Sequence, residues 1–92
     1  MPQLFKIGAY RVFFRANDSD PPEPFHVHIC EGEPQKDATK VWITRTGHVI
    51  LCHNKSRIPS AILRRILQMI EANSDTIREK WLELFGDITC YC

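Results

Sequence analysis

Histidine and cysteine alternate with apolar residues along one short stretch of this chain, residues 25–30. In an extended strand, residues two apart point to the same face and lie about 7 Å apart. His26, His28 and Cys30 therefore share one face, and the apolar residues between them share the other. Because imidazoles and thiols transfer protons and bind metals, this stretch carries the strongest chemical signal in the sequence.

Proton transfer is the first chemistry that this pattern could support. Histidine ordinarily titrates near neutral pH, so two neighbouring imidazoles can act as a general acid and a general base. His26 and His28 are therefore the candidate catalytic residues. A metal-independent ribonuclease would need only such a pair and a cation for the phosphate, which Arg11, Arg15 or Lys40 could supply.

Metal binding is the second chemistry. Zinc binds imidazole and thiolate groups, and His26, His28 and Cys30 could be joined by His48 or Cys52. However, ligands two apart on a strand are rarer than the Cys-x-x-Cys knuckle of structural zinc sites, which this sequence lacks. We therefore expect no metal and no cofactor. A Cys30 nucleophile is also unsupported, because no oxyanion-binding loop accompanies it.

The bulk composition is that of an ordinary globular protein. The chain has 92 residues, 43% hydrophobic and 25% charged, which predicts one domain over residues 1–92. A net charge of +1 gives no overall attraction to nucleic acid or to acidic lipid. We see no secretory signal and no apolar segment long enough for a membrane span, so we expect a cytoplasmic protein without membrane contact. Its four cysteines should then be reduced.

Hydrophobic periodicity predicts an α+β fold. Runs of β-forming residues bounded by turn formers predict four strands, over residues 4–15, 25–30, 38–44 and 48–53. From residue 58 onward the period changes to about 3.6, which predicts two helices, over residues 58–72 and 75–85. The expected architecture is a four-stranded, mainly antiparallel sheet with two C-terminal helices packed on one face, in the order ββββαα.

The alternation also assigns residues to the two faces of this sheet. The face under the helices should collect apolar side chains, namely Val27, Ile29, Val41, Ile43, Val49 and Leu51. The opposite face should carry a mixed set, namely His26, His28, Cys30, Trp42, His48, Ile50 and Cys52. Such a face is too apolar to stay uncovered, which predicts that a partner packs there. In the second helix Trp81 should be buried against the sheet, because it shares an apolar face with Ile77, Leu84 and Phe85.

Four basic residues gather around the start of the first helix: Lys55, Arg57, Arg64 and Arg65. Together with Trp42 they could follow a phosphate backbone, so nucleic acid is an alternative partner. Basic residues on the polar side of an amphipathic helix are nevertheless the usual arrangement for a solvated face. We interpret this cluster as a solvated face.

Four segments, in order along the chain, resemble domain-of-unknown-function family 4160, a group of small bacterial proteins. Residues 7–14 (IGAYRVFF) resemble its opening Gly-Tyr-Arg-Phe-Phe run, and residues 26–29 (HVHI) resemble its His-Val-His-Val core. Residues 38–43 (ATKVWI) resemble its Ala-Lys-Phe-Trp-Leu strand, and residues 77–86 fall where the family has its last helix. The hairpin around residue 47, the phenylalanine before the histidines and the tail after residue 86 depart from the family pattern.

The resemblance implies a context rather than an activity, because the family has no assigned activity. Its genes often sit beside another small gene, in an arrangement like that of toxin–antitoxin pairs, which implies a cognate small protein as partner. The leading hypothesis is a protein-interaction module of such a pair, with Trp42, Arg11 and Lys40 as binding residues. The alternative is a metal-independent ribonuclease-type toxin that uses His26 and His28. Enzymatic activity and oligomeric state are both left open by these hypotheses.

Overall fold

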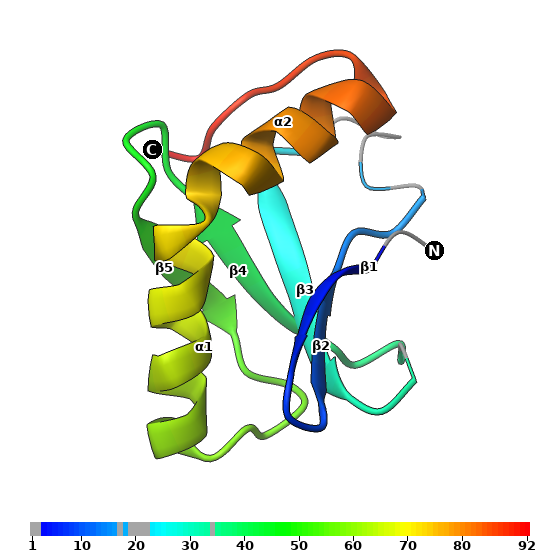
Figure 1. Ribbon diagram of the computed structural model, residues 1–92, viewed down its shortest axis with the longest axis vertical. Coiled ribbons are helices and arrows are strands. Elements are labelled where there is room, and N and C mark those ends of the chain that lie inside the picture. The colour runs from blue at the N-terminus through cyan, green and yellow to red at the C-terminus, as the bar shows by residue number, and fades with distance from the viewer. Residues whose placement is uncertain (1–2, 17, 19–22, 34) are drawn as a thin grey trace.

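The computed structural model describes residues 3–16, 18, 23–33 and 35–92. Five strands form one antiparallel sheet in which each strand lies beside its neighbour in sequence (Figure 1). They are β1 (Gln3–Ile7), β2 (Tyr10–Phe13), β3 (His26–Glu31), β4 (Thr39–Ile43) and β5 (Val49–His53). Two helices follow, α1 (Ser60–Ala72) and α2 (Ser74–Phe85). The predicted α+β class is confirmed, and β3 is the central strand of the sheet.

The N-terminal segment forms two strands where the sequence predicted one, so the prediction of a four-stranded sheet was wrong. Gly8 and Ala9 connect β1 to β2, and Ile7 pairs with Tyr10 across this two-residue turn. Gly8 has a φ of +58°, which glycine adopts without the steric cost that a side chain would add. A run of β-forming residues that is continuous in sequence thus folds back on itself, because one glycine permits a hairpin turn.

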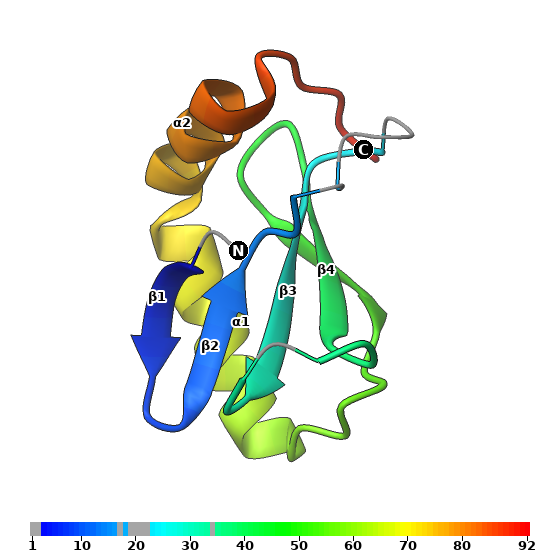
Figure 2. The same ribbon diagram turned by 90° about the vertical axis from the view of Figure 1, so that its right-hand side faces the viewer.

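Both helices cover the same face of the sheet (Figure 2). Apolar side chains from the strands and from the helices meet there in one buried cluster. Its members from the strands include Val12, Val27, Ile29, Val41 and Ile43, and its members from the helices include Leu63, Ile66, Ile70, Ile77 and Trp81. Because each such side chain contributes roughly 1.5–3 kcal/mol on burial, this cluster is the main source of the stability of the fold.

Trp81 is buried within a group of aromatic rings, which confirms the prediction for this residue. Its ring centroid lies 5.2, 5.4 and 4.5 Å from those of Phe14, Phe25 and Phe85. Its indole N–H donates a hydrogen bond to the carbonyl of Asp87 at 2.9 Å. Both the apolar body and the polar edge of the side chain are therefore satisfied.

Two residues that the sequence assigned to the core are exposed instead. Leu51 on β5 is 41% exposed, and Leu84 on α2 is 46% exposed. Leu51 does lie on the helix side of the sheet, because it pairs with Val41. However, β5 is an edge strand, and α1 packs beside Val49 but leaves Leu51 to solvent. Periodicity assigns a side chain to one side of its element, but it does not say whether another element reaches that side.

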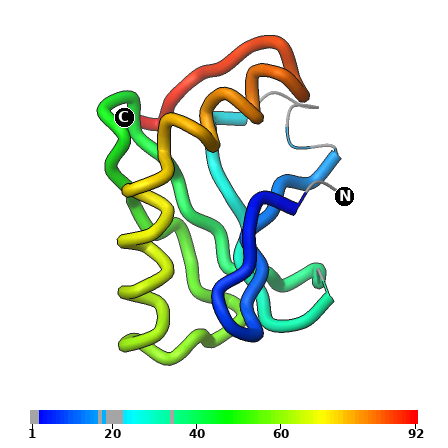
Figure 3. Tube along the Cα trace, in the orientation of Figure 1, coloured from blue at the N-terminus to red at the C-terminus, as the bar shows by residue number. Residues whose placement is uncertain are grey.

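The chain after α2 returns to the sheet, and its C-terminus lies beside the turn between β4 and β5 (Figure 3). Gly86 ends α2 in the left-handed conformation with a φ of +77°, as its position predicted. Beyond it, the carbonyl of Thr89 accepts a hydrogen bond from the N–H of Phe25 at 2.7 Å. The carbonyl of Cys92 accepts another from the N–H of Arg45 at 2.9 Å. These two bonds hold the tail against the sheet.

Two further observations bear on the sequence-based expectations. All four cysteines are free thiols. In the described part of the chain, no helix combines the length and the apolar character that crossing a lipid bilayer requires. The longer helix, α1, has 13 residues.

Truncating Trp81 should remove much of the stability of the fold. Trp81→Ala should lower the free energy of unfolding by about 3–5 kcal/mol, because it empties a space that aromatic rings surround. Leu84→Ala on the same helix should lower it by about 0.5 kcal/mol or less, because Leu84 is exposed. Urea denaturation followed by circular dichroism measures both values. Equal losses in the two variants would contradict the packing of α2 described here.

Candidate functional site

β3 is buried on both faces of the sheet, which the sequence did not predict. Val27 and Ile29 point to the helices and belong to the main core, as predicted. Strand alternation places His26 and His28 on the face opposite the helices (the outer face), although the ring of His26, at the start of β3, also lies 5.4 Å from that of Trp81 of α2. The two histidines are only 0% and 5% exposed. The prediction of an uncovered histidine face was therefore wrong, because the chain covers these histidines itself.

Asp18 covers the two histidines from the loop that follows β2. Its Oδ1 atom lies 3.0 Å from Nε2 of His28 and 3.2 Å from Nε2 of His26, and its side chain is buried. Its Oδ2 atom accepts a hydrogen bond from the backbone N–H of Arg15 at 2.8 Å. The N–H of Asp18 donates in return to the carbonyl of Arg15 at 3.1 Å. This local turn fixes the carboxylate against β3, and we call Asp18, His26 and His28 the Asp–His cluster.

Neighbouring loops complete the cover over the outer face of β2 and β3. The guanidinium of Arg15 donates to the carbonyl of Lys36 at 3.2 Å, which ties the loop after β2 to the loop after β3. Cys30 is buried on the same face, and its thiol donates to the carbonyl of Glu33 at 3.4 Å. Phe13 and Ala38 pack with Cys30 in a small second apolar cluster.

The pKa values of two members of the Asp–His cluster, Asp18 and His28, are lowered by their surroundings. Burial raises the pKa of Asp18, but the imidazoles of His26 and His28 and the N–H of Arg15 outweigh burial and hold this pKa well below its ordinary value. Burial lowers the pKa of His28 below the ordinary histidine value, although the carboxylate of Asp18 opposes this shift. At neutral pH Asp18 is therefore ionised and His28 is neutral, with its Nε2–H donating to Asp18.

His26 is held in the opposite tautomer. Its Nδ1 lies 2.7 Å from the carbonyl oxygen of Pro24, which can only accept, so Nδ1 carries a proton. Its Nε2 lies 3.2 Å from Oδ1 of Asp18, but it is buried and makes no hydrogen bond within the described part of the chain. In a neutral ring Nε2 has a lone pair, and here it faces an oxygen that also has lone pairs. A proton or a metal ion between the two atoms would remove their repulsion.

The structure groups potential metal ligands differently from the sequence prediction. The candidate ligand atoms of Asp18, His26 and His28 lie within 4.8 Å of one another. His48 and Cys52, by contrast, are exposed and lie near or on β5, which β4 separates from β3. Sequence reasoning missed Asp18 because it lies in a run of turn-forming residues. Its one signal in the sequence is its place in the loop that precedes the histidine strand.

The two candidate catalytic residues do lie together, since the ring centroids of His26 and His28 are 4.9 Å apart. Their burial leaves neither ring open to a substrate as large as RNA. Acid–base catalysis by this pair stays a prediction, and the geometry does not favour it.

Two of the three predicted binding residues lie together on the outer face of β4. The Nζ atom of Lys40 is 4.5 Å from the centre of the Trp42 ring, and it forms an ion pair with Glu23 at 2.6 Å. Tyr91 of the tail stacks on Trp42, with ring centroids 5.2 Å apart and an angle of 4° between the planes. The tail thus occupies surface that Trp42 would otherwise offer to a partner. Arg11 lies apart from this pair on β2, across β3 from β4.

The uncovered apolar part of the sheet lies on β5. Ile50 is 36% exposed, Leu51 is 41% exposed, and Cys52 is exposed as well. Ile50 pairs with Trp42 and Leu51 pairs with Val41, so the two side chains lie on opposite faces. Only β4 pairs with β5 among the described strands, which leaves the other side of β5 as a free edge.

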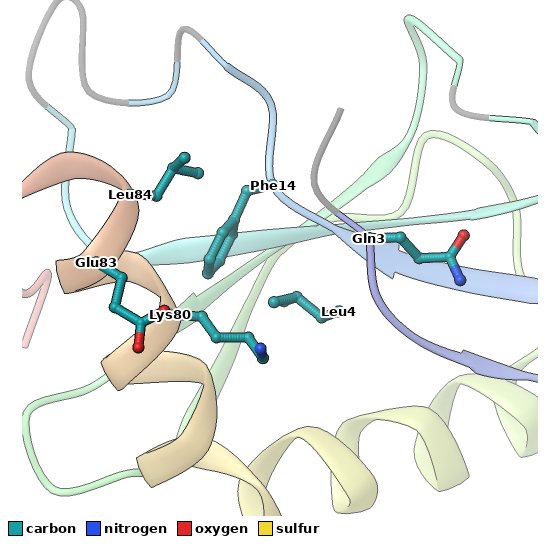
Figure 4. Close-up of a pocket in the computed structure, with 6 residues that line it drawn as sticks. All are labelled: Gln3, Leu4, Phe14, Lys80, Glu83 and Leu84. Carbon is teal, nitrogen blue, oxygen red and sulfur yellow. The ribbon is translucent and has the colours of Figure 1, made fainter.

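A pocket of about 360 Å³ opens between β1 and α2 (Figure 4). Leu4, Phe14 and Leu84 supply its apolar part, and Lys80 and Glu83 of α2 lie beside them. The residues that line it include none of those that the sequence assigned to a site. With one lysine and one glutamate, the pocket has no net charge that would favour an ionic ligand.

Comparison with known proteins gives one match. A family model described as domain of unknown function (DUF4160) matches residues 9–82. No curated protein and no solved structure matches the chain. The matched range includes the Asp–His cluster, β5 and α1, whereas the tail that covers Trp42 lies outside it.

Asp18 should make the stability of the fold depend on pH. Because its pKa is lower in the folded than in the unfolded chain, ionised Asp18 stabilises the fold above about pH 4, and this contribution is lost as the pH falls further. Asp18→Asn should lower the free energy of unfolding at pH 7 by about 1–3 kcal/mol, because a neutral amide replaces the charged acceptor of the His28 Nε2–H and of the Arg15 N–H.

The pH dependence of this loss is the test. The difference between wild type and Asp18→Asn should shrink as the pH falls from about 5 to about 2. Urea denaturation in buffers that contain a chelator measures it, and Asp37→Asn, at an exposed aspartate, is the matched control. A loss that stays constant over this pH range, or that appears equally in Asp37→Asn, would refute the ionised state assigned to Asp18.

Proposed function

This chain belongs to the DUF4160 family, a domain of unknown function, and we propose that it is a protein-binding module whose edge strand β5 pairs with a strand of a cognate small protein. In this proposal the partner is the product of the neighbouring gene, in a pair arranged like a toxin and its antitoxin. The observation that carries the proposal is the exposed apolar edge of β5.

An exposed apolar edge strand is a surface that native proteins normally protect, because its unpaired N–H and C=O groups recruit further strands. On β5, Ile50 and Leu51 are exposed on opposite faces, and no charged residue interrupts the strand before His53. The other edge strand, β1, carries an exposed lysine, Lys6, which is a common form of protection. This difference favours β5 rather than β1 as the binding edge.

The charges beside β5 indicate the chemistry of the partner strand. Lys55 and Arg57 follow β5 directly, and Arg64 of α1 lies beside Val49 in one pocket. All three are exposed, and none has an ion-pair partner within 4.0 Å in the described part of the chain. A second copy of this chain would bring like charges together, which disfavours pairing of β5 with itself. A strand with alternating apolar residues and flanking carboxylates fits this edge.

One backbone N–H on the free edge of β5 already has a hydrogen-bond partner. The N–H of Val49 donates to the carboxylate of Glu71 at 3.0 Å, so this position is protected by α1. Pairing with a partner would therefore use the part of β5 beyond Val49, which is the part that carries Ile50 and Leu51. Main-chain hydrogen bonds would supply affinity, and the two apolar side chains would supply specificity.

The ribonuclease alternative receives less support from the site. A catalytic histidine must contact its substrate, whereas His26 and His28 are buried beneath Asp18. The signature of this alternative would be growth arrest on induction of the chain, with loss of the arrest in His26→Ala. Growth arrest that persists in His26→Ala would exclude His26 as a catalytic residue.

The binding edge is tested by one substitution on β5 with a control on α2. The full chain is co-expressed with the product of the neighbouring gene, and the complex is isolated by size-exclusion chromatography. Leu51→Asp should weaken binding by at least about tenfold, because it places a carboxylate on the edge and removes an apolar contact. Leu82→Asp should bind as wild type does, because Leu82 is similarly exposed (39%) but lies on α2.

Thermal unfolding should be nearly unchanged in both variants, since both leucines are exposed. Absence of a complex with the wild-type chain would refute the proposed partner. Equal binding by Leu51→Asp and wild type would refute β5 as the interface, even if a complex forms.

A further inference from the structure

We infer that the Asp–His cluster is a buried binding site for a single zinc-class divalent ion. This site is separate from the β5 edge, so the inference goes beyond the proposed protein binding and does not depend on it. One carboxylate oxygen and two imidazole nitrogens converge from a loop and from the central strand, within 4.8 Å of one another. Carboxylate and imidazole are two of the three ligand types that zinc takes in proteins.

The spacing of the ligand atoms is close to what zinc requires. Zinc binds imidazole nitrogen at about 2.0–2.1 Å and carboxylate oxygen at about 2.0–2.2 Å, so the ligand atoms of a tetrahedral site lie roughly 3.3 Å apart. Oδ1 of Asp18 lies 3.0 Å from Nε2 of His28 and 3.2 Å from Nε2 of His26. Small movements of the two rings, together with loss of the Nε2 proton of His28 or its transfer to Nδ1 of the same ring, would bring all three atoms onto one ion.

The orphaned nitrogen of His26 is the independent observation that indicates a ligand. The Pro24 carbonyl accepts the Nδ1 proton, which leaves Nε2 as the ring atom that is free to bind an ion. This Nε2 is buried, is aimed at the cluster and has no hydrogen-bond partner among the described residues. An imidazole whose other nitrogen donates to a backbone carbonyl is also the usual form of a metal-binding histidine.

Asp18 is prepared for the same role. The Arg15 N–H binds one carboxylate oxygen, Oδ2, and so leaves Oδ1 directed at the two histidines. Second interactions of this kind hold ligands in place before the ion arrives. The thiol of Cys30, two residues after His28, donates to Glu33 instead and stays outside the cluster. The expected donor set is therefore two nitrogens and one oxygen without sulfur.

Burial favours zinc over iron for this donor set. Two histidines and one carboxylate also bind Fe(II) in oxygenases, but there the metal keeps several open positions for substrate and oxygen. Here the three residues are nearly inaccessible to solvent, which leaves no room for several exchangeable ligands, and a four-coordinate zinc would need only one water molecule beside the three protein ligands. The alternative occupant of the cluster is a proton on Nε2 of His26, which would make a buried ion pair with Asp18.

The experiment uses the full chain, treated with a chelator and then titrated with ZnCl₂ by isothermal calorimetry. One ion should bind per chain, and His26→Gln and Asp18→Asn should each weaken binding by about 100-fold or more. His48→Gln is the matched control, because His48 is an exposed histidine outside the cluster whose side chain is 73% exposed. It should bind zinc as the wild type does.

The absorption spectrum of bound Co²⁺ tests the site in the wild-type chain alone, so it does not depend on whether the variants fold. Co²⁺ added to the wild-type chain should give the visible absorption of a tetrahedral ion without a thiolate charge-transfer band, because the donor set has no sulfur. A thiolate band would assign the ion to the exposed cysteines and overturn the inference. So would undiminished zinc binding by a folded His26→Gln chain. A chain that binds no zinc would show that the cluster holds a proton instead.

Discussion

The carboxylate of Asp18 is removed from water, and an ionised group can be kept there only by donors or cations that surround it. The Nε2–H of His28 and the backbone N–H of Arg15 meet this requirement, and a proton or a metal ion on Nε2 of His26 would add to them. Because His26 and His28 belong to the central strand, Asp18 must lie over the outer face of the sheet. The Asp–His cluster thus covers the outer face of β3, as the helices and the apolar core cover its inner face.

This arrangement changes where the chain can meet other molecules. The outer face of β3 is closed by Asp18 and by the loops beside it, and Tyr91 covers part of Trp42 on β4. Among the described strands, β5 keeps an exposed apolar edge, with Ile50 and Leu51 on opposite faces. The Asp–His cluster and β5 both lie within the range that the DUF4160 model matches, whereas Tyr91 lies outside that range. A shared function of the family would therefore involve the first two features rather than the tail.

The sequence predicted the features that follow from the spacing of apolar residues within one strand or one helix. Alternation placed Val27 and Ile29 on one face of β3 and the histidines on the other, and the 3.6-residue period located both helices and the buried Trp81. The hairpin at Gly8 was missed because the β-forming residues continue through it. Asp18 was missed because a carboxylate among turn formers is usually solvated, and only the folded chain shows that two histidines lie opposite it. The exposure of Leu51 likewise depends on how far α1 reaches over β5, which no local pattern encodes.

The central claim is that Asp18 and Pro24 hold the two histidines of β3 in opposite tautomers. Long-range ¹H–¹⁵N correlation spectra of the imidazole rings in the metal-free chain test it most directly, because they show which ring nitrogens carry a proton. We predict that Nδ1 of His26 and Nε2 of His28 are protonated, with signals distinct from those of the exposed His48. Spectra in which His26 and His28 show the rapidly averaged tautomers of solvent-exposed imidazoles would contradict the account.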